Sequence, residues 1–256
     1  MSAIERILVT VRTYPNLSSK YLETVCTAGI NDQGEWRRLY PVPLRYLDDE
    51  RQYKTYDVIK VRLGSNPDGR PESRRPDTTS LEKVGELDAS PRGWQARCDW
   101  VLPTGLPSMR LLRESGRTLA PVAVTEVLEF VAQPDTAEWT PKQQELLRQA
   151  GLFEGPKPLE RLPFDFRLRW KDGEGAEHDS KFLAWEVGQT WRAYSRRYAD
   201  PIAAMRDKWM GDLFGPSRKV WFFMGNFAEH RQHFGVCGAF VPPKECASSG
   251  NLWSGG

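Results

Sequence analysis

The chain has 256 residues, of which 39% are hydrophobic and 27% are charged, and its formal net charge is +2. This composition is typical of a folded globular protein and excludes a disordered or fibrous one, and the low net charge excludes a global field that attracts polyanions. Positive charge is concentrated towards the two ends of the sequence, whereas the middle is acidic.

The sequence gives no sign of a membrane segment. No apolar run approaches the ~20 residues that a membrane-crossing helix needs, and the N-terminal stretch MSAIERILVTV lacks the apolar core of a signal peptide. We therefore expect a cytoplasmic protein without a membrane partner. The cysteines form no CxxC pair, which favours reduced thiols. They are Cys26, Cys98, Cys237 and Cys246.

The first third of the chain predicts a cluster of strands. Ile7, Val9 and Val11 recur at every second position, which predicts a strand that Pro15 ends. Two apolar runs flank the turn residues 31–34, and this pattern predicts a hairpin. The stretch TYDVIKVRL predicts a further strand, and the Pro- and Gly-rich residues 64–77 predict an irregular loop.

The acidic middle contains mixed signals. The stretch SMRLLRESG predicts a short helix that Gly116 ends, and APVAVTEVLEFV predicts a strand. Thr140, Pro141 and Gly151 stand where a helix over TPKQQELLRQAG would have its cap, its first residue and its end.

A second cluster of strands follows. Alternating apolar residues around the turn DGEG in FDFRLRWKDGEGAEHDSKFLAWE predict a hairpin. The stretch TWRAYSRRYADPIAAMRDKWMGDLF predicts helix with a break before Pro201, and RKVWFFMGN and HFGVCGAFVPP predict two closing strands.

Trp36, Arg38 and Tyr40 alternate along one predicted strand and therefore share a face. On a ligand-binding face, the two rings would stack on unpaired bases and Arg38 would meet phosphate. Alternatively, both rings fill a barrel interior and Arg38 lies at its mouth, because a strand Trp is more often buried.

Further basic residues are candidates for phosphate contacts. Lys60 and Arg62 point to one side of the next strand. Arg70, Arg74 and Arg75 follow in the loop, and Arg192 and Arg196 lie one helical turn apart. The strand and loop cations also have a plainer interpretation as a solvated surface that Asp68 and Glu72 partly neutralise, whereas Arg192 and Arg196 are free to meet an acidic partner.

Catalytic and metal-binding signals are sparse. His230, His233, Cys237 and Cys246 have no usual zinc-ligand spacing, so we predict no metal and no cofactor. The carboxylates most suited to chemistry are Glu72, which lies between arginines, and Glu186, which follows a tryptophan.

The order VCTAGI, a turn, EWRRLYPV and the loop RPES resembles the start of the bacterial dual-OB-domain-containing proteins. The later segments FRLRW, FLAWE and WFFMGN with FGVCGAF resemble that family in the same order. The resemblance implies OB-folds and nucleic-acid binding, within a bacterial or phage defence or conflict system.

We therefore predict a mostly β (α+β) fold, with two OB-like β-barrels and helical insertions. The expected units are a barrel over 1–80, a connector over 81–114, a barrel with helices over 115–243 and a flexible tail over 244–256. The leading functional hypothesis is binding of single-stranded or structured DNA or RNA. The alternatives are an enzyme that acts on nucleic acid or nucleotides through Glu72 or Glu186, and a module that binds an acidic protein partner.

Overall fold

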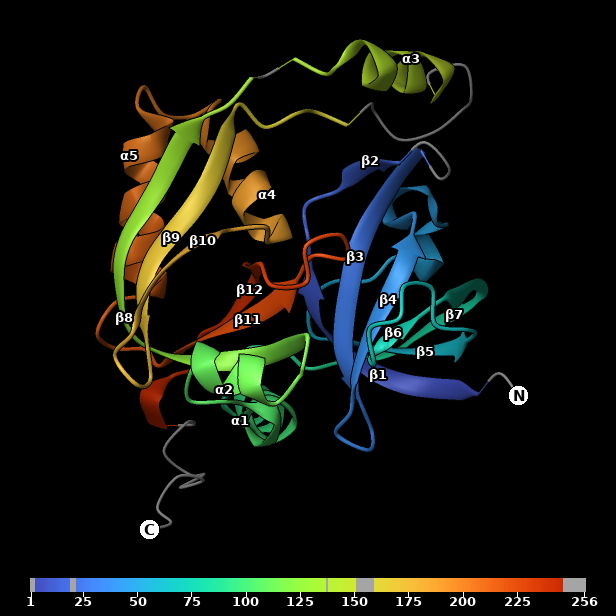
Figure 1. Cartoon of the computed structure of the whole chain (residues 1–256), viewed down its shortest axis with the longest axis horizontal. Helices are drawn as coiled ribbons and strands as arrows, with labels where there is room; N and C mark the ends of the chain where they lie inside the picture. Colours follow the sequence, from blue (N-terminus) through green and yellow to red (C-terminus); the bar gives the residue numbers. More distant parts are fainter. Residues whose placement is uncertain (1–2, 19–21, 137, 151–158, 246–256) are drawn as a thin grey trace.

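The computed structural model describes residues 3–18, 22–136, 138–150 and 159–245. It is built mainly from strands, which form one curled sheet in each half of the chain (Figure 1). The helices lie in the segments that connect the strands. The predicted mostly β fold with two OB-like barrels and helical insertions is confirmed. In the described residues, no helix is long and apolar enough to span a membrane.

The first barrel is formed by the N-terminal strands, and its hairpin is the one that the sequence predicts. β1 pairs antiparallel with both β3 and β5, β3 pairs with β4, and β5 pairs with β7. The strands are β1 (Ile4–Arg12), β2 (Asn16–Ser18), β3 (Leu22–Asn31), β4 (Trp36–Val42), β5 (Asp57–Leu63), β6 (Ser73–Arg74) and β7 (Pro76–Glu86).

A short parallel pairing closes this barrel. Arg38 and Leu39 of β4 pair with Ser73 and Arg74 of β6, and β6 is followed after one residue by β7. The edge strands β4 and β7 are thus connected, because the chain that pairs with β4 continues directly into β7. This corrects the prediction of an irregular loop over 64–77, because a two-residue parallel contact depends on a distant strand and leaves no local pattern.

The second barrel repeats this connectivity. β8 pairs with both β9 and β11, β9 pairs with β10, and β11 pairs with β12, all antiparallel. A parallel bridge between Phe182 and Val236 brings the ends of the sheet together. The strands are β8 (Leu119–Pro134), β9 (Phe164–Asp172), β10 (Glu177–Lys181), β11 (Val220–Asn226) and β12 (Phe234–Phe240). Each barrel therefore has the strand order of an OB-fold.

Helices occupy the connections. The connector contains α1 (Pro91–Val101), the 3-10 turn η3 (Leu102–Thr104) and α2 (Met109–Glu114), and the β8–β9 connection contains α3 (Pro141–Ala150). The third-to-fourth-strand connection contains η1 (Leu44–Tyr46) and η2 (Asp49–Arg51) in the first barrel. In the second barrel it contains α4 (Trp185–Tyr194), α5 (Pro201–Arg206) and the π-helical turn η4 (Asp207–Leu213).

Local sequence explains where these helices begin. Ser90, Ser108 and Asp200 each accept a hydrogen bond from a backbone N–H in the first turn of the helix that follows. Thr140 and Gln143 form reciprocal hydrogen bonds at the start of α3, as the cap predicted at Thr140 requires. Gly151, the predicted end of this helix, lies outside the described residues.

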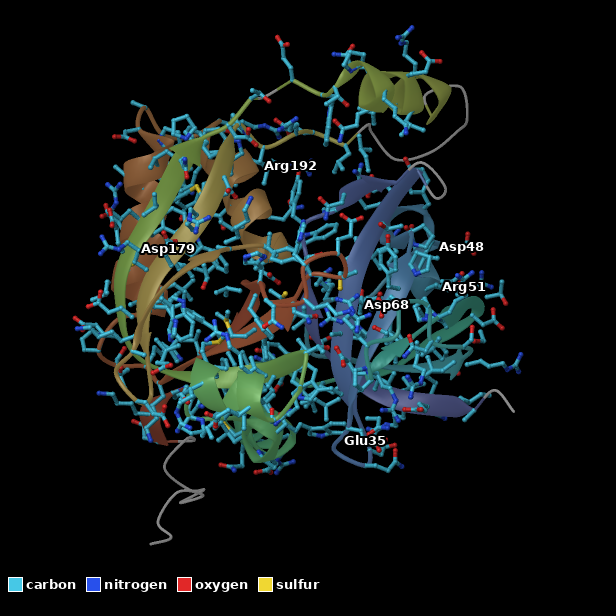
Figure 2. All side chains as sticks on the ribbon, viewed as in Figure 1. Glu35, Asp48, Arg51, Asp68, Asp179 and Arg192 are labelled. Carbon is cyan, nitrogen blue, oxygen red and sulfur yellow. The ribbon has the colours of Figure 1, made fainter. Side chains whose placement is uncertain are left out.

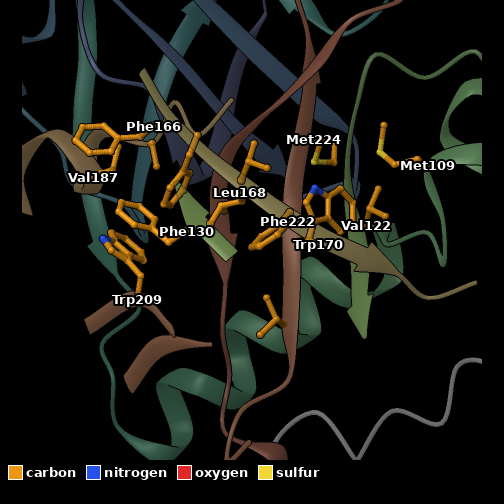
Figure 3. Close-up of a cluster of buried hydrophobic side chains, with 14 of the residues drawn as sticks. Met109, Val122, Phe130, Phe166, Leu168, Trp170, Val187, Trp209, Phe222 and Met224 are labelled. Carbon is orange, nitrogen blue, oxygen red and sulfur yellow. The ribbon is translucent and has the colours of Figure 1, made fainter. Parts of the chain in front are cut away.

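Buried side chains form three clusters. One fills the first barrel and includes Leu39 and Ile59. A second fills the second barrel, where Trp170 and Phe222 meet edge to face (Figure 3). The third lies between the barrels, includes Trp36 and Phe223, and fixes one barrel against the other.

The boundaries differ in places from those that the sequence predicts. The last strand of the first barrel runs on to Glu86, beyond the boundary expected at residue 80. Its second half carries many polar residues, which resemble a linker in the sequence, although pairing with β5 orders them. From residue 246 onward, the predicted flexible tail over 244–256 lies outside the described residues, and so does Cys246.

Candidate functional site in the cleft between the barrels

A cleft with a volume of about 950 Å³ lies between the two barrels. OB-folds bind their ligands on the second and third strands and on the loops after the first and fourth strands. In the first barrel these elements are β3, β4, the segment after β1 and loop 64–72, and all of them contribute to the cleft. The second barrel contributes the corresponding β9, β10 and loop 227–233. The two expected ligand faces therefore border one cavity.

A buried ion pair lies at the base of the cleft. Arg38 of β4 donates from Nε and Nη2 to Glu72 Oε1 at 3.2 and 3.1 Å, and Nη2 also donates to the Thr118 carbonyl at 3.1 Å. The Thr118 hydroxyl donates to the same Glu72 oxygen. Only 3% of the Arg38 side chain and 9% of the Glu72 side chain are exposed. These two charges are thus satisfied by each other and join the first barrel to the start of the second.

A second set of polar contacts connects loop 64–72 to the end of β11. Arg70 donates from Nε to Asp68 Oδ2 at 3.1 Å and from Nη1 to the Asn226 carbonyl at 2.9 Å. Asp68 of this loop is labelled in Figure 2. Burial alone would raise the pKa of Asp68, but hydrogen bonds from Arg70 and Ser73 and the charge of Arg70 outweigh it and lower this pKa to about 2. Asp68 is therefore ionised at neutral pH, and the loop is held in place.

Two half-buried rings in the cleft are suited to stacking. Tyr40 of β4 and Phe227 after β11 both line it, and neither ring contacts another aromatic or cationic side chain in the described part of the chain. Tyr14 and Phe164 also line the cleft, but their rings already contact Arg192 and Trp191, respectively. The available faces thus come from both barrels.

The accessible charges of the cleft are mixed. Arg75, Lys181 and His230 are exposed basic side chains in its lining, where Glu229 is an exposed acid and Asp165 a half-buried one. Lys181 Nζ lies 2.8 Å from Asp165 Oδ2, so part of its charge is neutralised. We infer a moderate attraction for anions, which aromatic contacts must supplement.

Two thiols, Cys26 and Cys237, lie in the deep part of the cleft beside Arg38. Arg38 Nη1 donates to Cys26 Sγ at 3.7 Å. Burial raises the pKa of Cys237 to about 12, so this thiol stays protonated and is a poor nucleophile.

The predicted stacking strand divides between core and cleft. Trp36 is 7% exposed and packs edge to face on Phe223, with 5.7 Å between ring centroids. The burial of Trp36 agrees with the prediction of a packed ring over that of a stacking one. However, the ring fills the space between the two barrels and not the interior of one barrel. Arg38 is buried, and Tyr40 alone of the three presents a half-buried side chain to the cleft.

Of the other predicted phosphate contacts, only Arg70 and Arg75 line the cleft. Lys60 and Arg62 are exposed on β5, outside its lining, and Arg62 lies 3.6 Å from Asp77. Arg74 Nη1 donates to the carbonyls of Pro71 and Ser73 at 2.9 and 2.7 Å. The structure therefore does not gather these cations into one groove.

Neither of the two helical arginines lines the cleft, although Arg192 contacts the lining residue Tyr14. Arg192 is on α4 (Figure 2). Its Nε lies 3.1 Å from Glu160 Oε2, and its guanidinium lies above the ring of Tyr14. Arg196 is exposed beyond the end of α4.

The catalytic candidates do not form a pair. Glu72 is held by Arg38, whereas Glu186 lines a different cavity, where Thr55 Oγ1 donates to it at 3.0 Å. Among the described residues, no three His, Cys, Asp or Glu side chains form a group that could hold a metal ion. The rings of His230 and His233 are neighbours, with 5.9 Å between their centroids. Cys246 lies outside the described residues.

Several cleft residues were missed by the sequence reasoning. Asp68, Lys181, Asn226 and Phe227 were not candidates, although each lies within a loop or strand end that the OB strand order brings to the ligand face. A positional rule applied to the predicted strands would have selected them. The chemical type of each residue, taken alone, did not identify them.

Two family models match the chain in succession. A domain of unknown function, DUF8758, matches residues 3–103, and a second, DUF8757, matches residues 106–253. The junction falls between α1 and α2, so each match covers one barrel. No curated protein matches the sequence.

Proposed function

Because the chain belongs to the DUF8757 family of domains of unknown function, we propose a function from its own geometry, namely the binding of single-stranded nucleic acid in the inter-barrel cleft. The observation that carries this proposal is the meeting of two OB ligand faces around one cavity. Both faces supply a ring without an aromatic partner among the described residues, Tyr40 from one barrel and Phe227 from the other.

The size of the cleft suits a short segment of strand. Its volume of about 950 Å³ lies near the upper end of the range for ligand sites, about 300–1,000 Å³. Stacking on Tyr40 or Phe227 requires bases that are not paired with each other. These features favour an unpaired segment over a regular duplex.

The charges of the cleft support phosphate contacts of limited number. Arg75 and Lys181 have exposed side chains at its lining, and Lys181 also pairs with Asp165, whereas Arg38 and Arg70 are buried in their ion pairs. Two phosphate contacts would give log K against log salt a slope of about −1.4 for a single strand. We therefore propose that base stacking provides much of the affinity and that sequence selectivity is weak.

The resemblance to bacterial dual-OB-domain-containing proteins supports the same proposal and extends it to a cytoplasmic role in a bacterial or phage conflict system. The extension is tested by phage challenge of cells with and without the gene. It fails if plaque numbers and cell survival are identical.

Direct binding is the primary test. Fluorescence polarisation with labelled oligothymidylate and oligouridylate of about 12 nucleotides, and with a duplex of the same length, compares the ligand classes. Tyr40→Ala should lose on the order of 1–3 kcal/mol of binding free energy for single strands. Tyr46→Ala is the matched control, because Tyr46 is 37% exposed and lies outside the lining of the cleft. Equal binding of duplex and single strand, or no effect of Tyr40→Ala, would contradict the proposal.

A further inference from the structure

A second cavity, of about 450 Å³, lies between the first barrel and the helical insertion of the second. Its walls come from β1, the turn before β5, α1, α4, η4 and β12. Phe182 and Cys237 line both this cavity and the cleft, and therefore form the partition between them. The cavity is thus a separate space with its own chemistry, and its volume is that of a small-molecule site.

Two polar atoms from opposite barrels have no hydrogen-bond partner in the described part of the chain. They are Oγ1 of Thr10 on β1 and Nε1 of Trp209 on η4. Both side chains line the cavity, and they are 2% and 5% exposed. Buried polar groups are usually satisfied, and an indole N–H can only donate. The Trp209 position therefore calls for an acceptor that the protein does not supply.

The cavity also has an excess of positive charge. Arg12 lies 3.9 Å from Glu186, and its Nη1 donates to the Tyr53 carbonyl at 3.0 Å. Lys208 and Arg218 line the same space half-buried, and neither has an ion pair among the described residues. Half-buried cations without a carboxylate partner favour an anionic ligand.

Aromatic side chains complete the walls. Tyr56, Trp94, Phe182 and Trp209 all line the cavity. Tyr56 has a φ of 72°, which is unusual for an aromatic residue, and its amide donates to the Val9 carbonyl at 2.6 Å. Backbone held in such a conformation is concentrated at ligand sites. Arg97 already lies over the rings of Tyr56 and Trp94, and Trp209 meets Phe182 edge to face, so these rings provide apolar walls for a ligand and not open stacking faces.

We propose that this cavity binds a small aromatic molecule with one anionic group, a phosphate or a carboxylate. The ring of the ligand packs among the aromatic walls, its anionic group meets Lys208 and Arg218, and one of its acceptors receives the Trp209 N–H. This site is additional to the proposed nucleic-acid cleft and does not depend on it.

Isothermal titration of the full chain tests the proposal with two probes. Adenosine 5′-monophosphate represents the phosphates and indole-3-acetate the carboxylates, with adenosine and indole as their uncharged counterparts. At least one anionic probe should bind with a Kd below about 1 mM, and its uncharged counterpart about tenfold more weakly. Failure of both anionic probes to bind at that concentration overturns the proposal.

Variants assign the binding to this cavity. Lys208→Met and Arg218→Met should each weaken the bound probe about tenfold, and Trp209→Phe, which keeps the ring and removes the donor, about fivefold. Lys60→Met and Trp100→Phe are matched controls outside the cavity lining. If Trp209→Phe is unstable, the increase in melting temperature that the probe causes provides a second readout. It is compared between wild type and Lys208→Met, a variant that alters only a half-buried side chain.

The same titration separates this site from the cleft. Tyr40→Ala lies in the lining of the cleft and should leave probe affinity unchanged. Loss of probe binding in Tyr40→Ala, together with unchanged binding in Lys208→Met, would place the probe in the cleft and overturn the proposal.

Discussion

Arg38 and Glu72 are joined through both backbone and side chain. The Arg38 amide donates to the Glu72 carbonyl at 2.9 Å, and Arg38 Nη2 lies 3.1 Å from Glu72 Oε1. The first contact is next to the parallel pairing that closes the first barrel, and the pair also engages Thr118, one residue before the second barrel begins. One buried ion pair thus links barrel closure to barrel docking, which gives Glu72 a structural role.

We predict that Glu72→Gln lowers the free energy of unfolding by roughly 3–5 kcal/mol, because it leaves the Arg38 charge buried without its counterion. Urea denaturation measures the change. Asp77→Asn, which breaks the exposed pair between Asp77 and Arg62, should cost only about 0–1 kcal/mol. Wild-type stability in Glu72→Gln would refute the structural role.

We expect Trp36→Ala to act through stability. The side chain is 7% exposed and packs against Phe223 in the cluster between the barrels, so truncation should cost on the order of 3–5 kcal/mol. Thermal melting of this variant is compared with that of Tyr40→Ala, whose ring is half-buried at the cleft and should affect stability less. A Trp36→Ala protein that melts normally but no longer binds single strands would instead make Trp36 a ligand contact.

The salt dependence of binding distinguishes the cleft from the outer surface. Replacement of both Arg75 and Lys181 by Ala should weaken all sequences alike and reduce the slope of log K against log salt by about 1.4. Lys60→Ala with Arg62→Ala removes the same charge from β5, outside the cleft lining, and should leave the slope unchanged. Binding is measured at about 50 mM and about 200 mM salt. A larger effect from the β5 pair would place the ligand on that surface.

Strands were predicted well from the sequence where apolar residues alternate along the strand and turn residues lie next to it. The alternation of Phe166, Leu168 and Trp170 gave the β9–β10 hairpin, because one face of that sheet is buried in the second barrel. Likewise, Ile7 and Val9 point into the first barrel from β1. These residues were predictable because a single apolar face decides both the conformation and its orientation.

The sites were less predictable because they depend on contacts between distant segments. In the sequence, Arg38 looks like a phosphate-binding cation, and only its pairing with Glu72 shows that it is buried. Trp36 was assigned to either a barrel interior or a binding face, whereas it lies between two barrels. The packing of one barrel against another leaves no period in the sequence of either.

The stability of the cleft should depend on pH through Asp68. Its pKa is about 2 in the folded protein, although burial opposes this, and an unperturbed Asp has a pKa of about 3.9. Because the folded pKa is lowered, the ionised form contributes stability that is present above about pH 4 and is lost as the pH falls towards 2.

Asp68→Asn should therefore lower the melting temperature at pH 7, and the difference in melting temperature between this variant and wild type should shrink between pH 4 and pH 2. Asp179→Asn, an exposed carboxylate on β10 away from the cleft lining, is the control. A difference for Asp68→Asn that stays constant with pH would mean that Asp68 gains no stability from its charge. In that case the contact between Arg70 and Asn226 would hold the loop without it.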